Sequence, residues 1–223
     1  AMIIAGQGLE ADSRALGARR VRRRLVATDE IVAAGASGIG FPLHNDVVAP
    51  YLLRLATEEQ KRRWLPGFCS GELITAIAMT EPGTGSDLQG IATNAKRDEN
   101  GDWILNGSKT FITNGGQADV VLVVAKTDPT AESQGISLLV VERGMAGFST
   151  SPHFDKLGMR GSNTGELVFD NAEIPFENVL GDEGRGVRVL MSGLDYERLV
   201  LSGIGTGIMA ACLDEVMPYV RER

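Results

Sequence analysis

Residues 78–87 read AMTEPGTGSD, where a predicted strand passes into a loop punctuated by glycine. The glycines allow the main chain to approach a ligand closely and leave backbone N–H groups exposed. Thr80 and Ser86 add two hydroxyl groups. This combination suits a phosphate or the polar edge of a heterocycle, and the alternative is an ordinary turn that Asp87 caps.

The hydrophobic period of the chain changes just before this loop and again near residue 181. Apolar residues recur every three or four positions from Ala11 to about Leu73, which predicts helices, and Thr57 is a helix start. The helical period returns after the glycine-rich linker Gly181–Gly186. Between the two helical blocks lie predicted strands at residues 74–80, 92–97, 103–105, 109–113, 120–126, 136–142 and 166–169.

This order of elements predicts an α+β fold rather than a doubly wound α/β sheet, in which strands and helices alternate throughout. We expect a helical N-terminal segment at residues 1–73, a middle β domain at 74–181 and the start of a helical bundle at 182–223. Asn106-Gly107 separates two of the strands and supplies the positive φ angles that a two-residue hairpin turn requires.

A second glycine motif, GASGIG at residues 35–40, looks like a dinucleotide fingerprint. That fingerprint needs a strand before it and a helix after it. Here the preceding segment reads helical, and Phe41-Pro42 follows where a helix should open. A nicotinamide enzyme is therefore the least supported reading of the chain.

The composition limits the class of protein. With 43% hydrophobic residues, the 223-residue chain can bury a sizeable core. The net charge of −7 disfavours a nucleic-acid-binding protein. The arginine-rich run from Arg14 to Arg24 is a local exception, for which the alternatives are a nucleic-acid patch, part of a transit peptide or a solvated helix face. No apolar run approaches the ~18 residues of a membrane span, so we expect a soluble intracellular protein without membrane contact.

Cysteine and histidine offer little chemistry of their own. Cys69 and Cys212 have no CxxC spacing, which predicts neither a metal site nor a disulfide framework. Neither His44 nor His153 lies near a serine or cysteine in a recognisable nucleophile motif. A bound cofactor is therefore the favoured source of reactivity.

A second polar strand end reads FITNGG at residues 111–116 and offers the aromatic ring of Phe111 and the hydroxyl of Thr113. By itself it indicates little, because an aromatic residue in a strand usually belongs to the core. Together with the loop at 78–87, it would give the β domain a flat wall for a ligand.

The last predicted helix carries a carboxylate, Glu197, inside its apolar stripe. Burial disfavours the charged form and raises the pKa, as a general base near neutral pH requires. The alternatives are a structural pair with Arg198 or Arg188, or a position at the rim of the stripe. The stripe comprises Leu190, Leu194, Leu201, Ile204 and Ile208.

In combination, these features resemble the acyl-CoA dehydrogenases. Residues 78–87 resemble the first flavin-binding signature of that family, and residues 111–115 resemble the second. KLGMRGSNT at 156–164 and LDYERLVL at 194–201 look closest to isovaleryl-CoA dehydrogenases. Residues 40–67 are more similar to long-chain or general bacterial acyl-CoA dehydrogenases. The resemblance runs from Ala33 to Arg223 and leaves out the arginine-rich first thirty residues.

The resemblance implies an FAD-binding middle domain built as an antiparallel β-barrel, and it assigns roles to particular residues. Glu197 would be the catalytic base. The implied flavin-binding residues are Ile77, Ala78, Met79, Thr80, Gly85, Ser86, Phe111, Ile112 and Thr113. The implied acyl-CoA contacts are Ser86, Ser133, Gln134, Asp195, Tyr196, Glu197 and Arg198.

The implied activity is FAD-dependent conversion of a saturated acyl-CoA, such as isovaleryl-CoA or a fatty acyl-CoA, into a trans-2-enoyl-CoA. Electrons would pass to an electron-transfer flavoprotein, and the enzyme would be a homo-oligomer, a tetramer at full length. It would act in the cytoplasm of a bacterium, which is favoured, or in the mitochondrial matrix. Family members continue into a four-helix domain beyond the position of Arg223, so we expect a truncated chain. A non-catalytic flavin- or acyl-CoA-binding fragment is the alternative.

Overall fold

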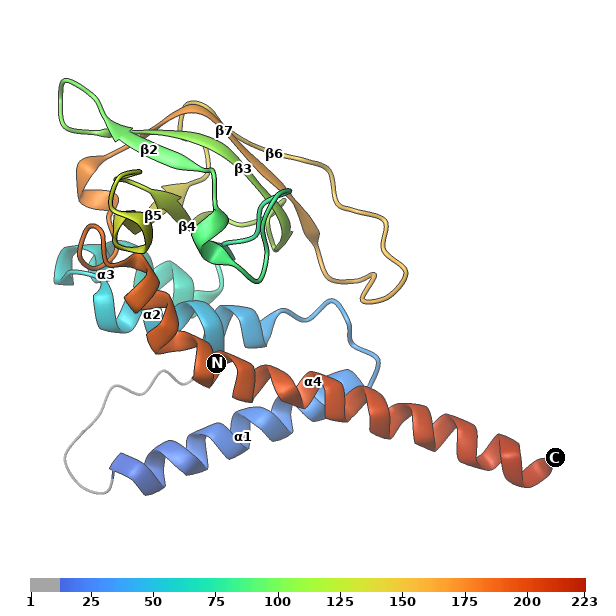
Figure 1. Ribbon diagram of the computed structural model, residues 1–223. Coiled ribbons are helices and arrows are strands. Elements are labelled where there is room, and N and C mark those ends of the chain that lie inside the picture. The colour runs from blue at the N-terminus through green and yellow to red at the C-terminus, as the bar shows by residue number, and fades with distance from the viewer. Residues whose placement is uncertain (1–12) are drawn as a thin grey trace.

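The computed structural model describes the backbone of residues 13–223 and the side chains of this range except those of residues 13–20, 132 and 133. A curled sheet lies on one side of the molecule and helices lie on the other (Figure 1). The last helix, α4 (Gly186–Glu222), runs beneath the sheet and projects past it. The predicted α+β architecture, with helical segments before and after the strands, is confirmed.

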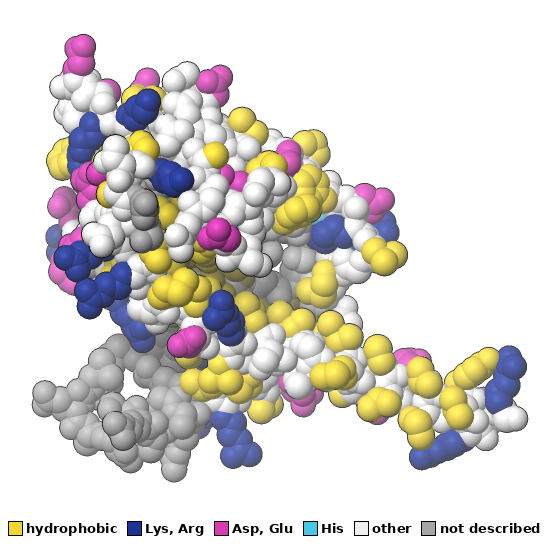
Figure 2. Space-filling model, in the orientation of Figure 1, with side chains coloured by type: hydrophobic (Ala, Val, Ile, Leu, Met, Phe, Trp, Pro, Cys, Tyr) yellow, Lys and Arg dark blue, Asp and Glu magenta, His cyan; other side chains and the backbone are white. Residues whose placement is uncertain are grey.

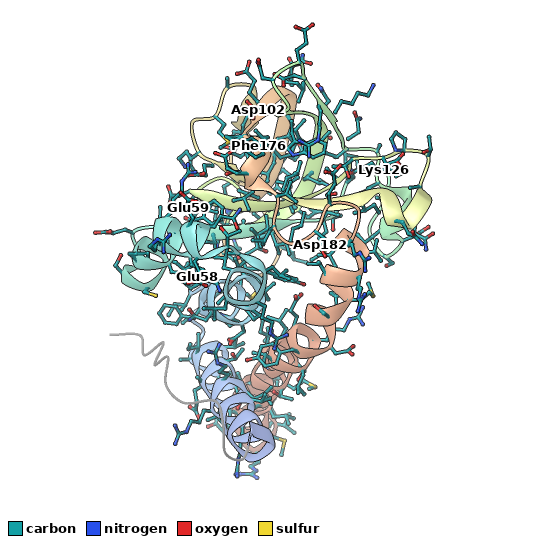
Figure 3. All side chains as sticks on the ribbon, turned by 90° about the vertical axis from the view of Figure 1, so that its left-hand side faces the viewer. Glu58, Glu59, Asp102, Lys126, Phe176 and Asp182 are labelled. Atoms are coloured by element: carbon teal, nitrogen blue, oxygen red, sulfur yellow. The ribbon has the colours of Figure 1, made fainter. Side chains whose placement is uncertain are left out.

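The helices before the sheet include the start predicted at Thr57. Thr57 Oγ1 accepts a hydrogen bond from Gln60 N (3.2 Å), and Gln60 Oε1 accepts one from Thr57 N (2.9 Å), which completes a capping box. Glu58 and Glu59, labelled in Figure 3, place negative charge at the positive end of the helix dipole. The helical elements are α1 (Ser13–Ala33), a π-helical segment (Leu43–Val48), α2 (Ala49–Leu55) and α3 (Glu58–Ser70).

Seven strands form one sheet in the order β1-β4-β2-β3-β7-β6, and β5 pairs with β4 off this path. Most strand pairs are antiparallel, as predicted for the middle domain, but β1 runs parallel to β4, and β2 pairs with β4 in parallel at Asn94 and Lys126. The excursion through residues 79–119 returns the chain in its original direction, and a parallel pair needs a long connection of this kind. The strands are β1 (Thr75–Ala78), β2 (Asn94–Arg97), β3 (Trp103–Thr113), β4 (Val120–Lys126), β5 (Ile136–Glu142), β6 (Phe148–Thr150) and β7 (Thr164–Ile174).

The central strands β4 and β5, which have the predicted bounds, are buried on both faces. Alternate residues of β4 point to opposite sides of the sheet. On one side Leu122 belongs to a core with Trp64 and Phe68 of α3. On the other side Val123 belongs to a core with Trp103 of β3. Burial on both faces explains why these strands read as continuous apolar runs.

Asn106-Gly107 does not form the predicted hairpin turn. Both residues lie inside β3, where the register against β7 shifts between Leu105 and Gly107, as at a β-bulge. A Cβ on Gly107, whose φ is 140°, would lie 2.6 Å from Thr93 Oγ1. Close packing against Thr93, a residue far away in the sequence, therefore requires glycine here. The hairpin instead joins β2 to β3 through residues 98–102.

The glycine motif at residues 35–40 follows α1 rather than a strand, so it lacks the element that a dinucleotide fingerprint requires. Contrary to expectation, helical backbone does begin at Phe41. Gly35 takes a φ of 72° just after α1, and a Cβ on Gly38 would lie 3.0 Å from the carbonyl oxygen of Gly161. Gly35 thus ends α1, and Gly38 allows the backbone to pack closely against Gly161.

One residue of the arginine run, Arg24, makes contacts that hold the fold together. Arg24 of α1 pairs with the buried Asp46 and donates from Nη1 to the carbonyl oxygen of Asn45 (3.0 Å), which ties α1 to the π-helical segment. Arg22 and Arg23 are exposed. The side chains of Arg14, Arg19 and Arg20 lie outside the described residues.

The buried face of α4 is lined by glycine and not by the whole predicted apolar stripe. A Cβ on Gly203 would lie 3.0 Å from Leu25 O, and one on Gly207 would lie 2.6 Å from Asp29 O. The backbone of α1 therefore packs directly on α4 at these positions. Of the predicted stripe, Leu190 is buried; Leu194, Leu201 and Ile204 are half-buried; and Ile208 is exposed.

Beyond Gly207, α4 exposes apolar side chains along its projecting part (Figure 2). By length and composition alone α4 could cross a membrane, contrary to the expectation from the sequence. A core helix of a soluble protein passes the same test, and the first half of α4 packs against α1. The exposed residues are Ile208, Met209, Leu213, Val216, Met217, Tyr219 and Val220.

Candidate functional site

A buried ion pair anchors the loop that follows β1. Lys109 Nζ lies 2.7 Å from Glu81 Oε1 and donates to the carbonyl oxygen of Met79 (3.0 Å). The backbone N–H groups of Ala92 and Thr93 also donate to the Glu81 carboxylate (2.6 and 3.1 Å). Burial alone would raise the pKa of Glu81, but these hydrogen bonds together hold the pKa below its usual value. Glu81 thus stays charged and joins the loop to β3.

This anchoring places Thr80 beside the end of β3, where Thr110 N donates to Thr80 O (2.9 Å). Thr80 and Met79 are half-buried, whereas Gly85 and Ser86 are exposed. Ile77 and Ala78 are buried in the cores on either side of the sheet, so they can offer a ligand only their backbone. The accessible residues of the loop thus include the hydroxyl of Ser86 and the bare backbone of Gly85.

The end of β3 turns Phe111 outward. The register against β7 shifts between Lys109 and Ile112, and Phe111 takes a φ of 57°. Its side chain is 68% exposed and meets Phe154 edge to face, with ring centroids 5.8 Å apart. A bulky residue in the left-handed region is uncommon, and such strain clusters at functional sites. Ile112 is buried in the core, and Thr113 is half-buried next to it.

Glu197 is buried on α4, as predicted, with 5% of its surface exposed. Its partner is neither Arg198 nor Arg188: Tyr51 of α2 donates from its hydroxyl to Glu197 Oε1 at 2.5 Å. Burial raises the pKa of Glu197, and the Tyr51 hydrogen bond and the charge of Arg198 lower it by less. The net effect is a carboxyl group that is easier to protonate than an ordinary glutamate.

The other predicted substrate residues lie along α4 and at its start. Asp195 and Arg198 are exposed, and Tyr196 is half-buried. Gln134 is exposed in a short turn against which Gly184 packs, near the beginning of α4, and the Ser133 side chain lies outside the described residues. Glu197 is roughly 16 Å along the helix from its start at the usual rise per residue. The structure therefore does not bring the turn and Glu197 together at one point.

A cleft of about 620 Å³, which the sequence reasoning missed, lies between the 38–44 segment, the end of α3 and the residues after β3. His44 lines it, stacks on Phe68 with ring centroids 3.7 Å apart and places Nδ1 2.8 Å from Thr75 Oγ1. Burial lowers the pKa of His44, which favours its neutral form. Asn114, which follows Thr113, also lines the cleft, so the cleft borders the end of β3.

The geometry reveals two further residues that the sequence reasoning missed. Tyr51 is 146 positions from Glu197, and no local pattern links the two. Gly193 belongs to the same cluster, because a Cβ there would lie 2.7 Å from Glu197 Oε1. Among the side chains of residues 21–131 and 134–223, no group of three or more His, Cys, Asp or Glu is placed to hold a metal ion.

Three family models match the chain. The acyl-CoA dehydrogenase N-terminal domain matches residues 14–72, the middle domain matches 76–172 and the C-terminal domain matches 184–223. The first match begins at residue 14, so the expectation that the resemblance starts only at Ala33 is wrong. Helix α1, with its arginine run, lies within the first match.

Curated relatives include both predicted subfamilies. Isovaleryl-CoA dehydrogenase of Solanum tuberosum is 52% identical over 199 residues, which are 89% of this chain and 48% of that protein. Long-chain specific acyl-CoA dehydrogenase of Rattus norvegicus is 45% identical over 200 residues, which are 89% of this chain and 46% of that protein. Both relatives are mitochondrial by name. The chain thus spans about half the length of the curated relatives it matches.

Solved structures give the same result. Acyl-CoA dehydrogenase from Geobacillus kaustophilus superposes with a TM-score of 0.84 and 46% identity, covering 90% of this chain and 53% of that chain. Butyryl-CoA dehydrogenase from Megasphaera elsdenii superposes with a TM-score of 0.85 and 35% identity, covering 91% and 53%. With all three family models matched in order along its length, the chain belongs to the acyl-CoA dehydrogenase family.

Proposed function

We propose that this chain is part of an FAD-dependent enzyme that removes two hydrogens from the α and β carbons of a saturated acyl-CoA and forms a trans-2-enoyl-CoA. The buried Glu197, whose pKa is raised on a helix beside the β domain, is the observation that carries this proposal. A carboxylate in these surroundings is poised to accept a proton, which a merely structural glutamate is not.

The end of β3 and the loop after β1 fit the flat ring of a flavin. Phe111 exposes its aromatic ring to solvent and has a strained backbone conformation. Both features cost free energy, and stacking of a ligand on the ring would offset that cost. Thr80, Ser86 and Thr113 would hydrogen-bond the polar edge of the ring, and Gly85 would let the backbone approach it. Met79 would add apolar contact to the flavin. Ile77, Ala78 and Ile112 would contribute through their backbone, and their buried side chains would support the binding surface by packing in the core. When bound, FAD supplies the acceptor for the hydride that leaves the β carbon.

Glu197 would remove the α proton of the acyl thioester. The carboxylate lies on the buried face of α4 beside Gly193 and Tyr51, so little water competes for its charge. A base in such surroundings binds the proton more strongly than an exposed glutamate does, which favours its transfer from a weakly acidic carbon. Asp195, Tyr196 and Arg198 would line the path of the substrate on the same helix.

The spread of the predicted contacts along α4 suits an extended acyl-CoA. The reacting end would lie at Glu197, and the CoA end would reach Ser133 and Gln134 near the start of the helix. Isovaleryl-CoA and fatty acyl-CoAs are the candidate substrates, since relatives named for both kinds are similar to this chain. An electron-transfer flavoprotein would accept the electrons. The exposed apolar residues of α4 beyond Gly207 support a homo-oligomer or further helical packing.

Visible absorption of the purified protein and anaerobic mixing with acyl-CoA test this proposal. A bound flavin band excludes a nicotinamide enzyme. Loss of that band on addition of isovaleryl-CoA or a longer acyl-CoA is the expected result, since the reduced ring absorbs less. A flavin band that no saturated acyl-CoA changes would favour a non-catalytic binding module and overturn the dehydrogenase proposal.

A further inference from the structure

The hydroxyl of Tyr51 has two acceptors within reach. It lies 2.5 Å from Glu197 Oε1 and 3.3 Å from the carbonyl oxygen of Leu190. A hydroxyl group has one proton to donate, and a charged acceptor forms the stronger and shorter bond. Tyr51 is 2% exposed and Glu197 is 5% exposed, so water does not compete for this bond. The Tyr51 proton therefore belongs to Oε1.

Gly193 makes room for the pair. A Cβ at this position would collide with the Tyr51 hydroxyl and lie 2.7 Å from Glu197 Oε1. Gly193 is one helical turn before Glu197, so any larger residue would fill the space in which the two side chains meet. The helix thus carries glycine where the hydrogen bond needs it.

The two oxygens of the carboxylate differ in their surroundings. Oε1 accepts from Tyr51, whereas Oε2 accepts no hydrogen bond from any residue within the described part of the chain. Oε2 is therefore the less occupied oxygen and the better placed of the two to accept a new proton.

We propose that Tyr51 is a positioning residue for the base: it fixes the Glu197 carboxylate through Oε1 and leaves Oε2 to accept the α proton. This inference rests on the proposed function. The hydroxyl favours the charged form of Glu197 and so limits how far burial raises its pKa. Without Tyr51, the carboxyl would be protonated at a higher pH and free to rotate.

Among the described side chains, few other ionisable groups act on this carboxyl. Arg198 on α4 is exposed, and its charge has a smaller effect than Tyr51. Arg24 of α1 and Asp46 of the π-helical segment pair with each other. His44 and Arg54 complete the ionisable side chains of the adjoining π-helical segment and α2. Of the side chains that the structure describes, Tyr51 is therefore the one whose removal should move the titration of Glu197 most.

The test is a pH titration of the chain with ¹³C-labelled glutamate carboxyl groups, followed by NMR. Comparison with Glu197→Gln identifies the Glu197 signal. Tyr51→Phe keeps the ring and removes only the hydroxyl, and we expect the Glu197 midpoint to move to higher pH. Tyr219→Phe, at an exposed position on α4, is the matched control and should leave the midpoint unchanged. An unmoved midpoint in Tyr51→Phe would overturn the proposal, as would an equal shift in both variants.

A second variant breaks the pair without touching either polar group. Gly193→Ala should push Tyr51 and Glu197 apart and shift the midpoint upward, whereas Gly205→Ala, which faces open space on the same helix, should not. Failure of Gly193→Ala to move the midpoint would also count against the pair. The titration needs neither FAD nor turnover, so it separates this inference from the proposed function. If that function holds, Tyr51→Phe should also move the acidic limb of flavin reduction by acyl-CoA to higher pH.

Discussion

The chain buries two glutamates to nearly the same degree but surrounds them differently. Glu81 is 6% exposed and faces the ammonium group of Lys109 at 2.7 Å, with two backbone N–H groups beside it. Glu197 is 5% exposed and, among the described side chains, accepts a hydrogen bond from the neutral hydroxyl of Tyr51 alone. The pKa of Glu81 is lowered and that of Glu197 is raised.

Burial by itself therefore does not decide what a carboxylate does. A buried carboxylate whose charge is fully compensated stays ionised and holds structure together, while one with a single neutral donor is ready to take up a proton. Glu81 fixes the loop that would bind the flavin, and Glu197 would act on the substrate. The same residue type serves the site in two ways because of its neighbours.

The largest expected effect on stability comes from removing the partner of Glu81. Lys109→Met leaves a buried carboxylate without a counter-charge and should lower the free energy of unfolding by about 3–5 kcal/mol. Urea unfolding followed by circular dichroism measures this. Lys96→Met, at an exposed position on β2, is the control and should change stability by no more than about 0.5 kcal/mol. Equal effects of the two substitutions would contradict the structural role of the ion pair.

The next largest effect concerns the close packing of α1 on α4. Gly207→Ala would place a Cβ 2.6 Å from Asp29 O of α1 and should destabilise the fold by about 1–3 kcal/mol. Gly205→Ala, two residues earlier and facing open space, should instead stabilise it by about 0.5–1 kcal/mol, because alanine is the better helix former. Thermal unfolding of both variants gives the comparison, and a shift of the same sign in both would argue against close packing of α1 on α4.

The smallest expected effects are two pH dependences of opposite sign. The folded-state pKa of Glu81 lies below its unfolded value, so its stabilising contribution is present above about 4.3 and is lost as the pH falls through the folded value. The folded-state pKa of Glu197 lies above its unfolded value, so its ionisation weakens the fold as the pH rises from about 4.3 through the folded value.

Urea unfolding of Glu81→Gln and Glu197→Gln across this range measures both dependences. The stability deficit of Glu81→Gln relative to the parent chain should shrink in acid. Glu197→Gln should gain stability relative to the parent as the pH rises. Dependences of the same sign in the two variants would remove the distinction between the two carboxylates.

The parts of the fold that local patterns specify could be predicted from the sequence. The apolar runs of β4 and β5 gave their bounds, and Thr57 with Gln60 marked the start of α3. Glu197 could be placed on a buried helix face because its neighbours repeat with the helical period. Each of these signals lies within a few residues of the element that it predicts.

The parts that depend on distant contacts could not be predicted. Asn106-Gly107 reads as a hairpin turn, but contact with Thr93 and the bulge against β7 place it inside a strand. The glycine face of α4 is visible only once α1 packs on it, because glycine carries no apolar signal. Tyr51 pairs with Glu197 across 146 positions, and nothing near either residue indicates the other.

Flavin reduction by Glu197→Gln is the decisive measurement. The variant should keep the bound flavin band, because Glu197 is not among the residues proposed to hold FAD, and should lose the bleaching that acyl-CoA causes under anaerobic conditions. Glu215→Gln, at an exposed position on the same helix, should bleach as the parent protein does. If Glu197→Gln bleaches at the parental rate, Glu197 is not the base, and its burial beside Tyr51 has another purpose.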